Sequence, residues 1–282
     1  MAGKVGIIDV GGGYRGVYGA GVLDYCLDND IKFDVAIGVS AGSANLVTFA
    51  ANQPRRTLKF YTEYGLRKEY ASVRNFIFKR SFVDLDYCYG TLSNSDGEYP
   101  LDYLAVKNNP MNFIAVATNA ITGKTKYFTV EDMAQDNYNI MKASSALPFA
   151  SPPYEISGEL YFDGGLSDIV PIKKAFDEGC DRVVLILTKP RDTIRTPEKD
   201  TFFANRIKKK YPKAAENLVK RAETYNNAVA LAKEYEKKGK VLIIAPTDTF
   251  GVDTLTKNAE SMKKLYDSGY QDGKSILDFI KH

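Results

Sequence analysis

Residues 33–50 read FDVAIGVSAGSANLVTFA, and this stretch decides the fold class. Phe33 to Val39 is apolar apart from Asp34, which is typical of a buried strand. From Ser40 onward the apolar residues have the spacing of a helix that ends near Pro54. A strand that runs directly into a helix is the repeating unit of a parallel sheet with helices on its faces.

The stretch before it has the same layout. Lys4 to Val10 reads as a strand, the glycines at 11–13 interrupt it, and a helix follows from about Arg15 to Leu27. Two such units in succession predict an α/β fold with a mostly parallel central sheet flanked by helices.

The rest of the chain adds further strands and helices. Residues 54–105 are helical or irregular, and we divide the chain into a main domain at 4–188 and a mainly helical C-terminal extension at 189–282, packed on the same domain. The predicted later elements are strands at Asn112–Thr118 and Lys124–Thr129, a helix at Glu131–Ser145, a strand at 160–163, a helix at Pro171–Glu178, a strand at Arg182–Leu187, a helix at Lys213–Lys238, a strand at Val241–Ala245 and a helix at Asn258–Lys281.

Composition excludes several classes of protein. A hydrophobic fraction of 44% over 282 residues is ample for a packed core, and a net charge of +3 argues against bulk nucleic-acid binding. Cys26, Cys88 and Cys180 are odd in number and show no C-x-x-C spacing that would suggest a metal or redox pair, so we expect a reducing, cytoplasmic setting. We expect no cofactor. We also expect neither a signal peptide nor a transmembrane segment.

Gly38-Val39-Ser40-Ala41-Gly42 is a G-x-S-x-G sequence at a predicted strand-to-helix turn. In many hydrolases such a turn exposes a nucleophilic serine, and the small flanking glycines avoid collisions. The simpler interpretation is that Ser40 caps the helix beside packing glycines.

The glycine-rich segment 11–16 follows a predicted strand and precedes a helix, so its backbone N–H groups could converge on an anion. Because parallel strands end at the same edge of a sheet, we expect this loop to face Ser40 as an oxyanion hole. Gly11, Gly13 and Gly16 also satisfy the dinucleotide fingerprint G-x-G-x-x-G. That fingerprint requires an acidic residue where the second strand ends, but Asp34 lies at the start of that strand.

The chain has a single histidine, His282, at its last position. A terminal imidazole is a poor base for Ser40, so the sequence argues against a Ser-His-Asp triad and points to a carboxylate. Asp163 ends a short apolar strand, and Gly164 and Gly165 after it would let the backbone turn the carboxylate into a site. Taken alone, Asp-Gly-Gly is also an ordinary turn.

These motifs, in this order, resemble those of the patatin-like phospholipase family, the bacterial branch in particular. The matching segments are Gly11–Gly16, Gly38–Gly42, Ala143–Pro148 and Asp163–Gly165. The resemblance covers about residues 4–188, fades over the C-terminal third, and implies a three-layer α/β/α fold.

The resemblance also implies roles for residues. Ser40 would be the nucleophile and Asp163 the base of a Ser-Asp dyad, in a family that hydrolyses acyl esters of lipids without a catalytic metal. The backbone of Gly11, Gly12, Gly13 and Gly16 would form the oxyanion hole with Arg15 at its rim, and Gly38, Gly42, Gly164 and Gly165 would support the turns. Asp9, two residues before the first glycine of the loop, has no role that the sequence assigns.

Two further features leave alternatives open. The basic cluster at 206–213 could rest on anionic lipid headgroups as a peripheral membrane contact, or it could be a solvated helix end. Eight aromatic residues could line an acyl pocket, form a lid over it, or simply pack in the core. They are Tyr61, Tyr64, Tyr70, Phe76, Phe78, Phe82, Tyr87 and Tyr89.

The sequence therefore supports three hypotheses. The first is a serine hydrolase that cleaves acyl esters of lipids through an acyl-enzyme, as a phospholipase or lysophospholipase. The second is a general carboxylesterase for soluble short-chain esters. The third is a non-catalytic lipid- or nucleotide-binding protein. Headgroup, acyl position and oligomeric state cannot be predicted from these residues.

Overall fold

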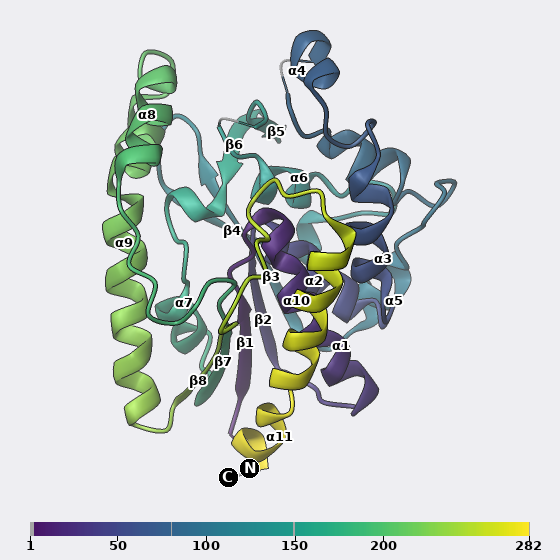
Figure 1. Ribbon diagram of the computed structural model, residues 1–282, viewed down its shortest axis with the longest axis vertical. Helices are drawn as coiled ribbons and strands as arrows, with labels where there is room; N and C mark the ends of the chain where they lie inside the picture. Colours follow the sequence, from purple (N-terminus) through teal and green to yellow (C-terminus); the bar gives the residue numbers. More distant parts are fainter. Residues whose placement is uncertain (1–2, 80, 149, 282) are drawn as a thin grey trace.

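The computed structural model describes residues 3–79, 81–148 and 150–281, with the backbone alone at Val73, Phe76 and Lys79 (Figure 1). His282 lies outside the described residues. The strands are β1 Val5–Asp9, β2 Val35–Val39, β3 Asn112–Asn119, β4 Thr125–Thr129, β5 Tyr154–Ile156, β6 Glu159–Asp163, β7 Arg182–Ile186 and β8 Val241–Ile244. They form one eight-stranded sheet.

Helices surround this sheet. They are α1 Val17–Asp28, α2 Ala41–Ala50, α3 Arg56–Thr62, α4 Val73–Lys79, α5 Tyr103–Asn108, α6 Asn139–Ser145, α7 Ile172–Asp177, α8 Glu198–Ile207, α9 Pro212–Lys237, α10 Ala259–Asp272 and α11 Ser275–Lys281. Single helical turns lie at η1 Gly13–Gly16, η2 Tyr64–Leu66, η3 Tyr87–Thr91, η4 Val130–Asp132 and η5 Gly164–Leu166.

The sheet is mostly parallel. β3, β2, β1, β7 and β8 are parallel neighbours, whereas β4 and β6 pair with β3, and β5 with β6, in antiparallel fashion. The prediction of a mostly parallel α/β sheet with flanking helices is confirmed. β8 lies in this same sheet, and α10 packs on α1, where the Tyr266 hydroxyl donates to Asp24 (2.7 Å). The C-terminal residues thus contribute both a strand and a flanking helix.

The two faces of the sheet are buried under different helices. Alternate strand residues such as Ile7 and Ile8 belong to separate hydrophobic clusters, as expected for side chains that point to opposite faces. One cluster includes residues of α1, α2 and α10, and the other includes residues of α7 and α9. Figure 1 shows α9 on one side of the sheet and α1, α2 and α10 on the other. Helices therefore cover both faces, in three layers.

Strand pairing brings two motifs to one point. Val116 of β3 pairs with β2 and β4, so these two strands lie on opposite edges of β3. Ala117 pairs with β4 and β6, so β6 also lies opposite β4. β2 and β6 therefore lie on the same edge of β3. β2 ends where Val39 meets Val116, and Asp163 of β6 meets the next residue, Ala117. Since Ser40 directly follows Val39, the sheet register places Ser40 beside Asp163.

Two predicted helices are wrong in extent. The predicted helix at Glu131–Ser145 is a single turn, η4, followed by irregular chain and then α6. Asp136 has a φ of 62°, which a helix cannot accommodate. The predicted helix at Asn258–Lys281 is divided into α10 and α11, with a break at Gly273, which packs closely against Tyr25. The first predicted helix begins at Val17, because residues 13–16 form the tighter turn η1.

Candidate active site

Ser40 occupies a strained turn. Its φ of 58° and ψ of −131° are unusual for a residue with a side chain, and such a conformation costs about 1–3 kcal/mol. The turn also needs its two glycines. A Cβ on Gly38 would lie 2.3 Å from the Cα of Ser43, and one on Gly42 would lie 2.1 Å from the carbonyl oxygen of Asp9. The G-x-S-x-G spacing is thus required sterically, and the turn places Ser40 at the end of β2, with 9% of its surface exposed.

The end of α6 holds this turn in place. The Ser40 N–H donates to Ser144 Oγ (3.1 Å), and the Ser43 hydroxyl donates to the Ser40 carbonyl (2.6 Å). The next turn of the same segment contacts β6, because the Asp163 N–H donates to the Ala146 carbonyl (2.9 Å). The segment 143–148 therefore positions Ser40 and Asp163 together.

Asp163 is buried, with 1% of its surface exposed. Oδ1 accepts the Gly165 N–H (2.7 Å), while Oδ2 has no hydrogen-bond partner in the described part of the chain. Burial raises the pKa of this carboxyl. The Arg221 charge, the nearby Ser40 hydroxyl and the Gly165 N–H lower it in part. One carboxylate oxygen is therefore fixed, and the other is left to receive a proton.

The glycine loop lies directly against the Ser40 turn. Gly11, Gly12 and Gly13 all have positive φ, and a Cβ on Gly11 would lie 2.4 Å from the Val39 carbonyl oxygen. The Gly11 N–H donates to Asp9 (2.8 Å). Over the described ranges, the N–H groups of Gly12 and Gly13 have no acceptor. Two backbone donors are therefore available near Ser40.

Asp9 anchors this loop, a role that the sequence did not reveal. Its carboxylate accepts the Gly11 N–H and the Asn45 side-chain N–H (2.7 Å), and Asn45 also donates to the Gly16 carbonyl (2.8 Å). Burial raises the pKa of Asp9 to about 6. Gly16, at the end of the glycine-rich segment, therefore contacts Asn45, and it lines neither of the two cavities described below.

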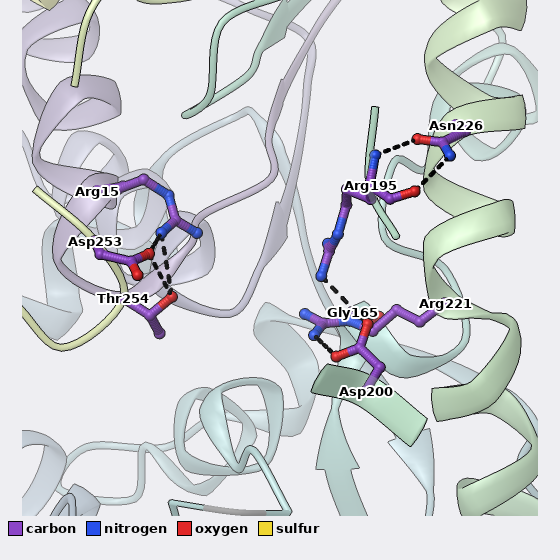
Figure 2. A network of polar contacts seen from close by, with 8 residues as sticks. All are labelled: Arg15, Gly165, Arg195, Asp200, Arg221, Asn226, Asp253 and Thr254. Carbon is purple, nitrogen blue, oxygen red and sulfur yellow. Dashed lines mark hydrogen bonds and ion pairs between the residues drawn. The ribbon is translucent and has the colours of Figure 1, made fainter. Parts of the chain in front are cut away.

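Asp253 and Thr254, from the C-terminal part of the chain, also contact the glycine loop. Arg15 pairs with Asp253 and donates to the Thr254 hydroxyl (3.2 Å; Figure 2). The Tyr14 N–H donates to the Thr254 carbonyl (3.2 Å). Arg15 Nε is buried and has no partner among the residues described. The conformation of the glycine loop therefore depends on residues more than two hundred positions later in the chain.

Ser40 borders two cavities of different character. The first has a volume of about 1080 Å³, including the part open to solvent, and its walls are mainly apolar and aromatic. Of the predicted aromatic residues, Tyr61, Tyr70 and Tyr89 line this cavity. Phe78 is exposed, and the side chain of Phe76 lies outside the described residues. The remaining lining includes Tyr14, Phe60, Leu85, Leu92, Met141 and Leu147.

The second cavity is polar, with a volume of about 610 Å³ including its open part. Ser40, Asp163 and the glycines at 11–13 lie on its wall together with four cationic side chains. These are Arg15, Lys189, Arg195 and Arg221. The basic cluster at 206–213 spans the end of α8 and the start of α9, and none of it lines either cavity.

Two protein-family models match segments of this chain. A family model described as patatin-like phospholipase matches residues 10–176, which include Ser40 and Asp163. The chain belongs to the patatin-like phospholipase family. A second family model, described as a domain of unknown function, DUF6363, matches residues 211–282.

Relatives of the patatin-like chain include proteins of quite different length. The uncharacterized protein YjjU of Escherichia coli strain K12 is 26% identical over 289 residues, which cover 98% of this chain and 77% of that protein. Lysophospholipase NTE1 of Coccidioides immitis strain RS is 23% identical over 298 residues, which cover all of this chain but 18% of that protein. A crystal structure of VipD from Legionella pneumophila shares the fold, with a TM-score of 0.50, 14% identity, and coverage of 99% of this chain and 67% of that one.

The family match does not extend to every residue of the site. Lys189, Arg195 and Arg221 follow the matched segment, and sequence reasoning missed them because no local motif distinguishes them from surface cations. In the described ranges, no group of three or more His, Cys, Asp and Glu residues could hold a metal ion. Within the same ranges, no helix is both long and apolar enough to span a membrane.

Proposed function

We propose that this chain is a serine hydrolase that cleaves acyl esters of lipids, with Ser40 as nucleophile and Asp163 as base. The observation that carries the proposal is the position of Ser40. It lies on a strained turn beside a buried carboxyl with one unpartnered oxygen, between an apolar cavity and a loop with two unused N–H groups. Family membership and the similarity to a lysophospholipase support the same activity.

In the first half-reaction, the Ser40 Oγ attacks the carbonyl carbon of the ester and its proton passes to Asp163 Oδ2. The carbonyl oxygen becomes an oxyanion, which the N–H groups of Gly12 and Gly13 would stabilise. Such a base typically contributes about 10²–10⁴ in rate and each oxyanion donor about 10²–10³. When the carbon–oxygen bond breaks, Asp163 returns the proton to the leaving alcohol, and an acyl-enzyme remains.

In the second half-reaction, a water molecule takes the place of the alcohol. Asp163 accepts a proton from this water, whose oxygen attacks the acyl carbon, and Ser40 leaves with the proton that Asp163 returns. No histidine is needed, because a single carboxylate performs both transfers. The Arg221 charge and the Gly165 N–H favour the ionised form of this carboxylate and offset part of the effect of burial, which raises its pKa.

The apolar cavity favours a lipid over a small soluble ester. Its aromatic and aliphatic walls begin at Ser40 itself, so an acyl chain could remove much apolar surface from water while its ester lies at the nucleophile. A series of nitrophenyl esters tests this directly. We expect kcat/KM to rise as the chain lengthens from acetyl to decanoyl, whereas a maximum at acetyl would favour a general carboxylesterase.

Labelling with a fluorophosphonate probe, followed by peptide mass mapping, tests the nucleophile. We expect the adduct on Ser40, and we expect Ser40→Ala to abolish both labelling and ester hydrolysis while the far-UV circular dichroism spectrum is unchanged. Ser268→Ala, a serine of α10 outside both cavities, is the matched control and should keep full activity. An adduct on another serine, or turnover near wild type in Ser40→Ala, would refute the assignment.

A further inference from the structure

The wall of the apolar cavity includes one charged side chain among the residues described, that of Arg56. Arg56 is 8% exposed and makes no ion pair within the described ranges. Its guanidinium group donates to the Pro100 carbonyl (2.8 Å) and to the Ser93 hydroxyl (3.0 Å), and it lies over the Tyr99 ring, 4.5 Å from the centroid. These contacts fix the group but leave its positive charge without a counter-ion.

A buried cation without a counter-ion is unfavourable, because desolvation disfavours the charged form of the group. Burial accordingly lowers the pKa of Arg56, although a guanidinium group stays protonated in proteins. In the polar cavity, by contrast, Arg195 and Arg221 share the buried carboxylate of Asp200, at 3.5 and 3.3 Å (Figure 2). The proposed ester cleavage uses no cation at the position of Arg56. The unpaired charge therefore indicates that a ligand of the apolar cavity supplies the anion.

Arg56 lies at the end of the cavity remote from Ser40. One face of α2 forms a wall between them, and its lining residues are Ala41, Ala44, Val47 and Thr48. Thr48 is eight residues after Ser40, or about 12 Å along a helix axis. The Gln53 N–H donates to the Thr48 carbonyl (3.3 Å), and its side chain donates to the Pro100 carbonyl (3.2 Å). Because the same Pro100 carbonyl accepts from Arg56, the guanidinium group lies about one length of α2 from the nucleophile.

We propose that the apolar cavity binds an acyl chain that ends in a carboxylate, with the ester at Ser40 and the terminal carboxylate on Arg56. The preferred substrates are then esters of dicarboxylic acids with about ten carbons, since an extended chain of that length matches the span of about 12 Å along α2. A guanidinium group binds a carboxylate through two parallel hydrogen bonds, and the methylenes between the two ends lie against the apolar wall. This inference rests on the proposed hydrolase activity of Ser40.

Two esters of equal chain length test the terminal group. Mono-4-nitrophenyl sebacate ends in a carboxylate, and 4-nitrophenyl decanoate ends in a methyl group. The measured quantity is the ratio of the kcat/KM of the sebacate ester to that of the decanoate ester. We expect Arg56→Met to lower this ratio at least about tenfold, the effect of losing one charge-assisted contact, and Arg56→Lys to give an intermediate ratio. Lys107→Met removes an exposed cation of α5, outside both cavities, and should leave the ratio unchanged.

A length series on the wild type tests the position of the cation and needs no variant, so it remains valid if Arg56→Met fails to fold. The ratio of the carboxylate ester to the methyl-terminated ester is measured for the adipate and hexanoate pair, the suberate and octanoate pair, and the sebacate and decanoate pair. We expect the ratio to rise along this series, because the shorter chains would leave their carboxylates in the apolar part of the cavity. A ratio that stays constant or falls with length would overturn the assignment.

A binding measurement separates this inference from the catalytic proposal. Ser40→Ala protein is titrated calorimetrically with monomethyl sebacate, with and without Arg56→Met. Weakening of binding by at least about tenfold supports the site on Arg56, even if the wild type hydrolyses no ester. Unchanged binding overturns it, even if the wild type is an active hydrolase.

A final comparison distinguishes the acyl side of the ester from the alcohol side. The substrate 4-(decanoyloxy)benzoate carries its carboxylate on the alcohol, and phenyl decanoate lacks that carboxylate. The ratio of the kcat/KM values for these two esters should be the same in wild type and in Arg56→Met. A loss of at least about tenfold in this ratio would show that the alcohol occupies the apolar cavity, and it would overturn the assignment.

Discussion

The stability of this protein should depend on pH through Asp9. Burial raises the pKa of its carboxyl from 3.8 to about 6, despite the hydrogen bonds from Asn45 and Gly11. The folded state therefore holds the proton more tightly than the unfolded state. The resulting stabilisation is fully present below the unfolded pKa and is lost as the pH rises through the folded pKa. At about 1.4 kcal/mol per pKa unit, this group alone should lower the free energy of unfolding by about 2 kcal/mol between about pH 4.5 and about pH 7.5.

The variant Asp9→Asn isolates this effect. Its amide oxygen can still accept the Gly11 N–H, but its N–H₂ group would face the Asn45 donor, so the variant loses one hydrogen bond at every pH. The titration, however, disappears. The stability of Asp9→Asn relative to wild type should therefore improve by about 2 kcal/mol from the lower to the higher pH. Other carboxyls with raised pKa values, such as the buried Asp24 and the half-buried Asp168, contribute equally to both proteins and cancel.

Urea unfolding monitored by far-UV circular dichroism measures this difference, since the chain has no tryptophan for fluorescence. Asp30→Asn is the matched control, because the Asp30 carboxyl is exposed and asparagine tolerates its positive φ. Its stability relative to wild type should be the same at both pH values. If Asp9→Asn behaved like this control, the buried carboxyl would not titrate in this range and the reasoning would be wrong.

Three further predictions concern catalysis. Asp163→Asn should lower kcat at least about 10²-fold, whereas Asp168→Asn, which changes a half-buried carboxyl that lines neither cavity, should not; equal losses would argue against Asp163 as the base. Because burial raises the pKa of Asp163, the acid limb of kcat/KM should lie above the ordinary aspartate pKa of about 3.9, and deleting His282 should not move it. Gly12→Val would place its Cβ 2.7 Å from Thr188 Oγ1, beside the oxyanion donors, so kcat should fall far more than the affinity for oleate; equal changes in both would contradict the oxyanion role.

Local patterns predicted the parts of the site that depend on neighbouring residues. The strand before Ser40 and the helix after it are both continuous in sequence, so the turn between them could be located, and the glycines that the turn needs flank it at fixed spacing. Asp163 could be chosen because a short apolar strand ends there before two glycines. The role of Asp9 could not be predicted, since it depends on a contact with Asn45 in another element.

The cationic wall of the polar cavity could not be predicted for a related reason. Arg221 belongs to α9, whose amphipathic pattern does not distinguish a cation that faces a cavity from one that faces solvent. Lys189 and Arg195 come from a charged segment without periodicity. The prediction of a helix at Glu131–Ser145 was wrong for a different reason. The composition of this segment favours a helix, but Asp136 has a left-handed backbone conformation that interrupts it.

The contacts between the glycine loop and the C-terminal segment have a consequence for synthesis of the chain on the ribosome. The Thr188 hydroxyl donates to the Gly11 carbonyl from 177 residues away, and Arg15 meets Asp253 from 238 residues away. At about 5–20 residues per second, the nascent chain must wait on the order of ten seconds or more after Arg15 is made before its partner emerges. During the first part of that interval, until β7 has been translated, β1 also lacks its neighbour on one side. We therefore expect the nascent chain to lack a completed glycine loop, and with it the proposed hydrolase activity, until Asp253 and Thr254 have been translated.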